Sequence, residues 1–270
     1  MSVTKPLLFI LLKVINKFYI VDYLVSFNSI FQFSYFQSVV GISKENFEDL
    51  YNKLSWKEED FKKKLIPLHQ LLITMIWLRL YSSLKLLSWI FKIDISTISR
   101  YILNILDKLY DVMETEVYIP EKEHRLSQGQ FLRRFHITMV LDGTEQKIVT
   151  STCKKKTKIT FSGKKKSDTF TKLVGVGLDG QIWYLSPSYG GHLNDLNLVD
   201  LAENSIYSKF LTKEEWIIAD RGFNGQIKRH ILSFNYFKNT EDESVFLKYR
   251  SVVENSIAKI KKWQICSLKF

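Results

Sequence analysis

The spacing of apolar residues changes once along the chain, between residues 120 and 135. Up to residue 120, apolar side chains recur at every third or fourth position and Gly41 is the one glycine, which is typical of amphipathic helices. From Phe135 on, short β-branched and aromatic runs alternate with Asp-Gly and Gly-rich turns, which is typical of strands. The sequence therefore predicts an all-helical region followed by an α/β domain, with the boundary in the polar residues 121–129.

The charge of the chain favours an anionic partner. Lys and Arg number 39 and Asp and Glu 28 among 270 residues, which gives a formal net charge of +11. Such a surplus is typical of proteins that bind nucleic acid, although a merely basic soluble protein has the same composition.

The N-terminal apolar run and the cysteines favour a protein inside the cell. The run at residues 7–12 is interrupted by Lys13 and Lys17 before it reaches the ~20 residues of a membrane span, and no small-residue cleavage site follows. Cys153 and Cys266 have no CxxC spacing, so neither a disulfide framework nor a zinc site is indicated. We expect a buried helix at residues 7–12 and no membrane partner.

Several elements are predicted in the second half of the chain. They are a strand at 136–141 that ends at Asp142, a hairpin of 172–178 and 182–185 joined by a type I′ turn at Asp179-Gly180, a helix at 193–205, a short buried strand at 216–219 and a final helix at 251–263. These elements predict a sheet with helices packed against it.

Residues 84–109 predict two helices joined by a short turn. The second helix has Asp94 as its N-cap and a stripe of apolar residues that would face the core: Ile95, Ile98, Ile102, Ile105 and Leu109. It would present outward Ser96, Thr97, Arg100, Tyr101 and Asn104. A helix of this kind can enter the major groove of DNA, and Ser96, Thr97 and Arg100 are the candidate contacts. The alternative is an ordinary helical hairpin.

Three carboxylates are candidates for a metal site. Asp142 and Asp220 each follow an apolar strand, and Glu254 lies on the last helix, on the same face as Arg250 and Lys261. Phosphodiester cleavage with two metal ions requires such carboxylates to hold the ions. Each acid also has a structural alternative: a turn at Asp142, an ion pair of Asp220 with the next residue, and an ion pair between Glu254 and Arg250.

Five segments of the second half, taken in order, resemble a known family. They are VLDGTE, FSGKKK, LVGVGLDGQIWYLSPSYGGHLND, IIADRGF and the Arg250…Glu254…Lys261 spacing. Together they resemble the DDE endonuclease domain of Harbinger-like and related bacterial insertion-sequence transposases. The resemblance covers residues 135–270, and residues 65–109 resemble the helix-turn-helix region that often precedes this domain.

The resemblance implies a ribonuclease-H-like mixed sheet with flanking helices and a set of functional residues. It implies Asp142, Asp220 and Glu254 as catalytic acids that bind two divalent ions, Mg²⁺ or Mn²⁺. It implies that Arg250, Lys261 and the basic loop of Lys164, Lys165 and Lys166 contact DNA. Asp195 is either an accessory acid or the cap of its helix, and we favour the cap. Arg250 and Lys261 have structural alternatives too, an ion pair and a solvated charge.

These observations predict three regions: residues 1–64 of unknown role, a DNA-binding helix-turn-helix region at 65–120, and the endonuclease domain at 135–270. The expected protein is a transposase that binds transposon ends, cuts DNA and transfers strands, as a homo-oligomer on DNA, in a eukaryotic nucleus or otherwise in the bacterial cytoplasm or nucleoid. The chain ends soon after Glu254, where relatives usually continue. A domesticated or truncated DNA-binding protein that does not cut, or a basic scaffold, are therefore the alternatives.

Overall fold

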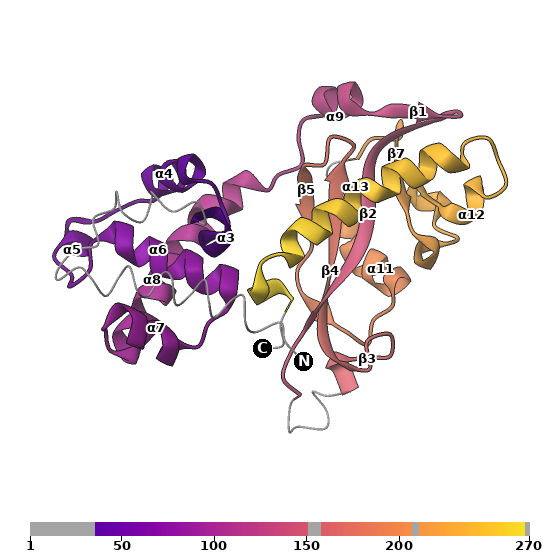
Figure 1. Ribbon diagram of the computed structural model, residues 1–270. Helices are drawn as coiled ribbons and strands as arrows, with labels where there is room; N and C mark the ends of the chain where they lie inside the picture. Colours follow the sequence, from indigo (N-terminus) through magenta and orange to yellow (C-terminus); the bar gives the residue numbers. More distant parts are fainter. Residues whose placement is uncertain (1–35, 151–157, 207–210, 268–270) are drawn as a thin grey trace. The chain divides into compact units, whose positions relative to one another are not determined.

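The computed structural model describes residues 36–150, 158–206 and 211–267, in two compact units, Met1–Val112 and Met113–Phe270 (Figure 1). The expectations for residues 7–12 and for Cys153 lie outside the described residues. In the described part of the chain, no helix has both the length and the apolar character to cross a membrane.

The first unit is built from helices, as predicted. They are α3 (Phe36–Val40), α4 (Lys44–Lys53), α5 (Glu58–Phe61), α6 (Pro67–Leu80), α7 (Leu84–Phe91) and α8 (Ile95–Glu116). Side-chain caps fix two of the starts: Ser43 Oγ accepts from the Asn46 N–H at 3.2 Å, and Ser83 Oγ accepts from the Leu86 N–H at 3.2 Å. α7 ends at Lys92, which adopts a left-handed conformation with φ of 51°.

The second unit is an eight-stranded mixed sheet with helices packed on it. Its strands are β1 (Gln130–Leu132), β2 (Phe135–Lys147), β3 (Phe161–Ser162), β4 (Ser167–Gly177), β5 (Ile182–Leu185), β6 (Tyr189–Gly190), β7 (Glu215–Ala219) and β8 (Ile231–Ser233). The main order is β3-β4-β2-β7-β8, with β2, β7 and β8 parallel and β4 antiparallel to β2. The long central strand β2 therefore sets the register of its neighbours.

The expectation that the first strand ends at Asp142 is wrong. β2 continues to Lys147, because residues 142–147 keep pairing with β4 after the shorter β7 has ended. The hairpin of β4 and β5 is confirmed, but its turn is not type I′. The loop spans residues 178–181 and has a positive φ at Gly180 alone, whereas a type I′ turn requires one at both central residues.

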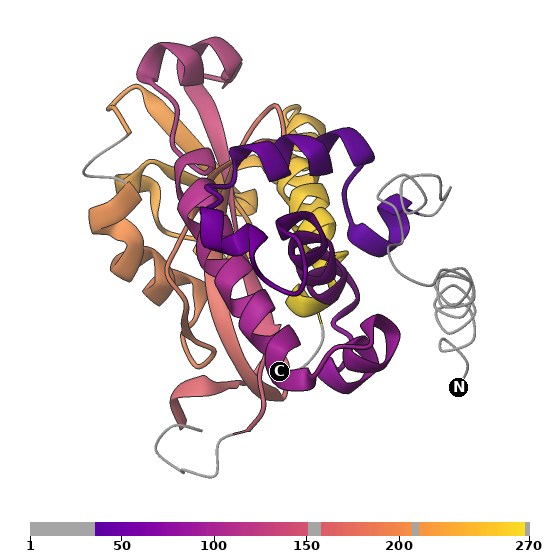
Figure 2. The same ribbon diagram turned by 90° about the vertical axis from the view of Figure 1, so that its left-hand side faces the viewer.

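Helices cover both faces of the sheet, and alternation along the strands separates two cores. On one face, α13 (Glu243–Lys261) packs Phe246 and Val253 against β2, β4 and β7. On the other, α11 (Asp195–Ile206) packs Leu198 and Val199 against the same strands. Figure 2 shows α11 (orange) and α13 (yellow) on opposite sides of the sheet. The α/β class with a ribonuclease-H-like mixed sheet after a helical region is therefore confirmed.

The remaining short elements lie at the edges of the second unit. They are α9 (Lys122–Gln128), α12 (Phe234–Phe237) and the 3₁₀ turns Arg221–Phe223, Ile227–Arg229 and Gln264–Cys266. α13 begins at Glu243, well before the predicted start at 251. Its first turns contribute Phe246 and Tyr249 to the core.

The polar stretch between the helical and strand-like parts contains a buried ion pair. Arg125 on α9 donates to both carboxylate oxygens of Glu215 at the start of β7, each at 2.7 Å. The two side chains are 5% and 0% exposed, and Arg125 also donates to the Pro120 carbonyl. Glu215 accepts in addition from the Thr212 N–H at 2.9 Å and its hydroxyl at 3.0 Å. This network fastens α9 to the sheet.

Candidate active site

Asp142 and Asp220 lie on neighbouring parallel strands. The residues before them, Leu141 and Ala219, are register partners in β2 and β7. Val140 and Ile218 belong to the core under α13, and side chains two positions apart in a strand share a face. Asp220 keeps an extended backbone with φ of −67° and ψ of 174°. Both carboxylates therefore face the side of the sheet that carries α13.

Arg250 on α13 joins the second and third predicted acids. Its Nη2 lies 2.8 Å from Glu254 Oε1 and 3.6 Å from Asp220 Oδ2. The ion pair between Arg250 and Glu254, given above as the structural alternative, is thus present. Asp220 pairs with Arg250 rather than with the residue that follows it, since the Arg221 guanidinium lies 4.4 Å from the centre of the Phe234 ring.

Asp195 does not cap its helix, which corrects the favoured reading. The cap is Asn194, whose Oδ1 accepts from the Asn197 N–H at 2.9 Å. Asp195 is the first residue of α11, and its carboxylate lies against two glycines. A Cβ added at Gly143 would lie 3.1 Å from Asp195 Oδ1, and one at Gly222 would lie 2.3 Å from Oδ2. Glycine at both positions leaves the room that this carboxylate occupies.

The electrostatics join the three aspartates in one site. The pKa of Asp142 is raised to about 6, mainly by burial and also by the charges of Asp220 and Asp195, while the Gly143 N–H and Arg250 act to lower it. Burial also raises the pKa of Asp195, with Lys164 opposing and the charges of Asp220 and Glu145 adding to the rise. Carboxylates that repel one another in this way are expected where a cation is to be bound.

The raised pKa of Asp142 leads to a prediction about stability. When a folded-state pKa is raised, the ionised carboxylate costs folding free energy above that pKa, and the cost disappears as the pH falls towards the ordinary value near 4. In EDTA at pH 7.5, Asp142→Asn should therefore be more stable than wild type, by on the order of 1–3 kcal/mol. At pH 4.5 the difference should be smaller. Urea unfolding at the two pH values measures it.

The exposed Asp179 provides the control for that measurement. Its side chain accepts from the Gln181 N–H at 2.9 Å, an interaction that asparagine can keep. Asp179→Asn should leave stability unchanged at both pH values. An Asp142→Asn variant less stable than wild type at pH 7.5 would contradict the assignment of repulsion at the site.

Three side chains of the site carry donor atoms that suit a divalent metal. Asp142, Asp220 and Asp195 offer carboxylate oxygens, the ligands that hard divalent cations prefer. Among residues 36–150, 158–206 and 211–267, however, no three His, Cys, Asp or Glu side chains are close enough together to be a ready metal site. The donor chemistry fits such an ion, and Arg250 is the cation that lies beside Asp220 and Glu254 in this structure.

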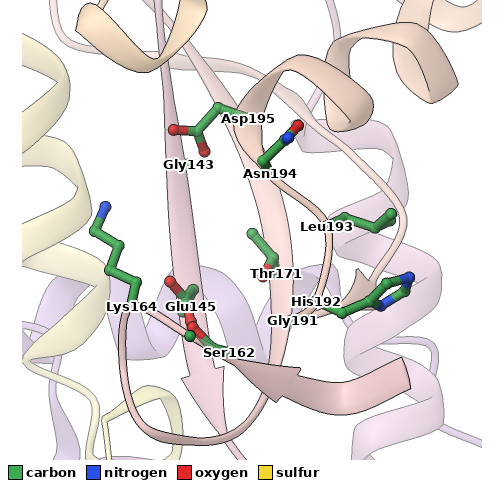
Figure 3. Close-up of a pocket in the computed structure, with 11 residues that line it drawn as sticks. Gly143, Glu145, Ser162, Lys164, Thr171, Gly191, His192, Leu193, Asn194 and Asp195 are labelled. Carbon is green, nitrogen blue, oxygen red and sulfur yellow. The ribbon is translucent and has the colours of Figure 1, made fainter. Parts of the chain in front are cut away.

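A pocket of about 230 Å³ lies beside Asp195, on the opposite face of β2 from Asp142. Figure 3 shows Asp195 at one end and Glu145 with Ser162 at the other. Sequence reasoning missed Glu145, although period-two alternation in VLDGTEQ places it on the other face of the strand from Asp142. The signal was hidden because the strand was expected to stop at Asp142.

The predicted basic DNA contacts occupy two places. Lys164, Lys165 and Lys166 are exposed on the loop between β3 and β4, and Lys164 also lines the pocket. Lys261 is not a solvated charge: its ammonium donates to the carbonyls of Glu145 at 2.5 Å and Cys266 at 2.9 Å. Burial accordingly lowers the pKa of Lys261.

The two predicted helices of the helix-turn-helix are present as α7 and α8. Four residues of the predicted stripe are buried, but Ile95 is 42% exposed, because it lies in the first turn of α8 before the helix meets its neighbours. Ser96 and Arg100 are exposed and Thr97 is half-buried, whereas Tyr101, expected to face outward, is 7% exposed. Tyr101 follows the buried Ile98 by three positions and so belongs to the core-facing side.

Comparison with known families matches two parts of the chain. Residues 141–269 match the family model described as DDE superfamily endonuclease. Residues 63–115 match the model described as helix-turn-helix of DDE superfamily endonuclease. No curated protein and no solved structure matches the chain.

Proposed function

Because the chain belongs to the DDE superfamily of endonucleases, with a helix-turn-helix region before the endonuclease domain, we propose that it is a metal-dependent transposase. It would bind the ends of a transposon, hydrolyse phosphodiester bonds and transfer the freed strands. The observation that carries the proposal is the position of Asp142 and Asp220, which share one face of two paired parallel strands. Asp195 stands close enough to act electrostatically on both.

Nucleases of this superfamily generally use divalent metals, and we propose two ions, Mg²⁺ or Mn²⁺. Asp142 and Asp220 would hold them with Glu254, and Asp195 would add a fourth carboxylate. Bound ions supply Lewis acidity and lower the pKa of water. Arg250 pairs with Asp220 and Glu254 in this structure. When those acids bind metal, its guanidinium would pair with a DNA phosphate instead.

The two domains imply DNA binding, and we propose how the chain divides this task. Residues 65–120 would read the transposon end through Ser96, Thr97 and Arg100, and residues 135–270 would cut it. The DNA backbone would be bound by Lys164, Lys165 and Lys166, because lysine contacts to phosphate add affinity without sequence information. Lys261 would also bind the DNA backbone once its ammonium no longer donates to the carbonyls of Glu145 and Cys266. Two ends must be brought together for transposition, so we propose a homo-oligomer on DNA.

Nicking of supercoiled plasmid in Mg²⁺ or Mn²⁺, beside a reaction in EDTA, tests the proposal. DNA binding is measured in parallel over a salt series, since backbone binding weakens steeply as salt rises. Metal-dependent nicking with salt-sensitive binding supports the transposase. Absence of salt-sensitive binding would leave only a basic scaffold.

One observation favours a second candidate, a transposase-derived DNA-binding protein that does not cut. Arg250 occupies the position between Asp220 and Glu254, and no three acids of the described chain are gathered for a metal. Salt-sensitive binding without nicking in either metal would favour this candidate.

The position of the Asp195 carboxylate against Gly222 leads to a prediction about metal affinity. Gly222→Ala should force the carboxylate away, because the new Cβ would lie 2.3 Å from Oδ2. Affinity for Mn²⁺ should fall about 10- to 100-fold, the effect typical of disturbing a ligand's support. Calorimetric titration with Mn²⁺ measures this. Gly163→Ala is the matched control, since a Cβ there meets no atom within 4 Å. Unchanged Mn²⁺ affinity in Gly222→Ala would remove Asp195 from the metal site.

A further inference from the structure

The pocket beside Asp195 contains a buried hydroxyl without a partner. Thr171 on β4 lines the pocket and is 4% exposed, and within the described chain its Oγ1 makes no hydrogen bond. A buried polar group left unpaired costs about 1–3 kcal/mol. The Oγ1 atom itself has almost no accessible surface, so a ligand in the pocket would become its partner once the Thr171 side chain turns towards it.

The charged side chains of the pocket exclude an anion as that ligand. Glu145 and Asp195 place carboxylates at its two ends (Figure 3), and Lys164 at the rim is already within electrostatic reach of Asp195. One oxygen of Glu145 accepts from the Thr169 hydroxyl at 2.9 Å, which holds the carboxylate in place. The two carboxylates repel a phosphate and accept hydrogen bonds from N–H groups.

The walls of the pocket combine exposed backbone with one apolar side chain. Gly143, Gly163 and Gly191 contribute backbone surface without side chains, and Leu193 adds an apolar contact. A volume of about 230 Å³ is larger than a bare ion requires and accommodates a heterocycle. Enzymes that do chemistry on a base extrude it from the stack and read it in a pocket by hydrogen bonds to its edge.

We propose that this pocket receives one unpaired nucleobase of the DNA and prefers a base with an exocyclic amino group over thymine. The amino group donates to the Glu145 or Asp195 carboxylate, and the Thr171 hydroxyl donates to a ring nitrogen or carbonyl of the base. Thymine has one N–H on this edge, at N3, and the two carbonyl oxygens beside it would be turned towards the carboxylate and repelled. The proposal rests on the proposed function, because Asp195 would serve both the metal site and the nucleotide next to it.

The test measures binding in EDTA, where no cleavage occurs. The probes are fluorescein-labelled DNA hairpins with a one-nucleotide bulge that is cytosine, thymine or an abasic analogue. Anisotropy titration of the wild type should give about tenfold tighter binding of the cytosine bulge than of the abasic one, the worth of about one hydrogen bond to a charged group. Thymine should bind like the abasic probe. In Thr171→Val the preference for cytosine should fall severalfold.

Thr138→Val is the matched control for the threonine variant. Thr138 is also fully buried with a hydroxyl that has no partner in the described chain, and it does not line the pocket. Both variants should fold at least as stably as wild type, since an apolar group replaces an unpaired one. Thr138→Val should keep the preference for cytosine.

Equal affinity for the cytosine and abasic bulges would overturn the proposal, as would a full preference for cytosine in Thr171→Val. The outcome is separable from that of the plasmid assay. A protein that nicks DNA without discriminating the bulges retains the transposase function and lacks the base pocket. A protein that discriminates the bulges but never nicks has the pocket and fails as a nuclease.

Discussion

Asp220→Asn is expected to reduce metal-dependent nicking by about 10³-fold, which corresponds to about 4 kcal/mol of lost transition-state stabilisation. The substitution keeps the shape of the side chain and removes the charge that faces Asp142 and Arg250. Asp142→Asn should have a similar effect, because its carboxylate lies on the same face of the paired strand. Initial rates of plasmid nicking at saturating Mn²⁺ measure both.

The control for these rates is again Asp179→Asn, which changes an aspartate in the loop between β4 and β5. It should nick at the wild-type rate. Salt-dependent DNA binding should persist in all three variants, which separates lost chemistry from lost binding. If Asp220→Asn nicks as fast as wild type, the carboxylate pair is not the catalytic centre.

Arg125→Met should destabilise the protein by about 3–5 kcal/mol, the usual effect of leaving a buried charge unpaired. The loss comes from Glu215, which is 0% exposed and whose two oxygens both accept from Arg125. Hydrogen bonds from Arg125 and Thr212 outweigh burial and keep the pKa of Glu215 below its usual value. The wild-type pair therefore contributes stability above the ordinary pKa near 4.5, and this contribution is lost on acidification. Urea unfolding at pH 7 measures the change.

Two comparisons sharpen this result. Lys122 lies on α9, as Arg125 does, and forms an exposed ion pair with Glu214 at 3.0 Å. Lys122→Met should therefore reduce the free energy of unfolding by less than about 1 kcal/mol. The double variant Arg125→Met with Glu215→Leu should recover much of the loss, because no buried charge then remains. A single variant Arg125→Met as stable as wild type would show that water or another group satisfies Glu215.

The placement of Asp142 and Asp220 beside each other could be predicted because each follows a mainly apolar run. Such runs identify the buried strands that become β2 and β7, and parallel pairing then brings Asp142 and Asp220 together. The sequence could not predict how far β2 extends. Residues 144–147 are polar and resemble a loop, and their strand state depends on pairing with β4, which is distant in the chain.

Asp195 and Tyr101 show the second limit of prediction. An acid before an apolar helix has the pattern of a cap, and only the neighbouring Asn194 decides that Asp195 is free to turn towards Gly143 and Gly222. Tyr101 is polar enough to be expected on the surface, but its place on α8 next to Ile98 buries it. Both assignments depend on competition between neighbouring residues, for the cap in one case and for the buried side of the helix in the other, and residue type alone does not decide it.

The unbroken course of β2 limits how this gene segment can vary. Asp142 faces α13, whereas Gly143 and Glu145 line the pocket on the other face. Deletion or insertion of a single codon between residues 139 and 145 would exchange these faces, so that the carboxylate would point into the pocket and the pocket residues towards α13. The segment can therefore accept substitutions far more readily than a change of length by one residue, whereas a change by two would preserve the faces and shift only the register with β4 and β7.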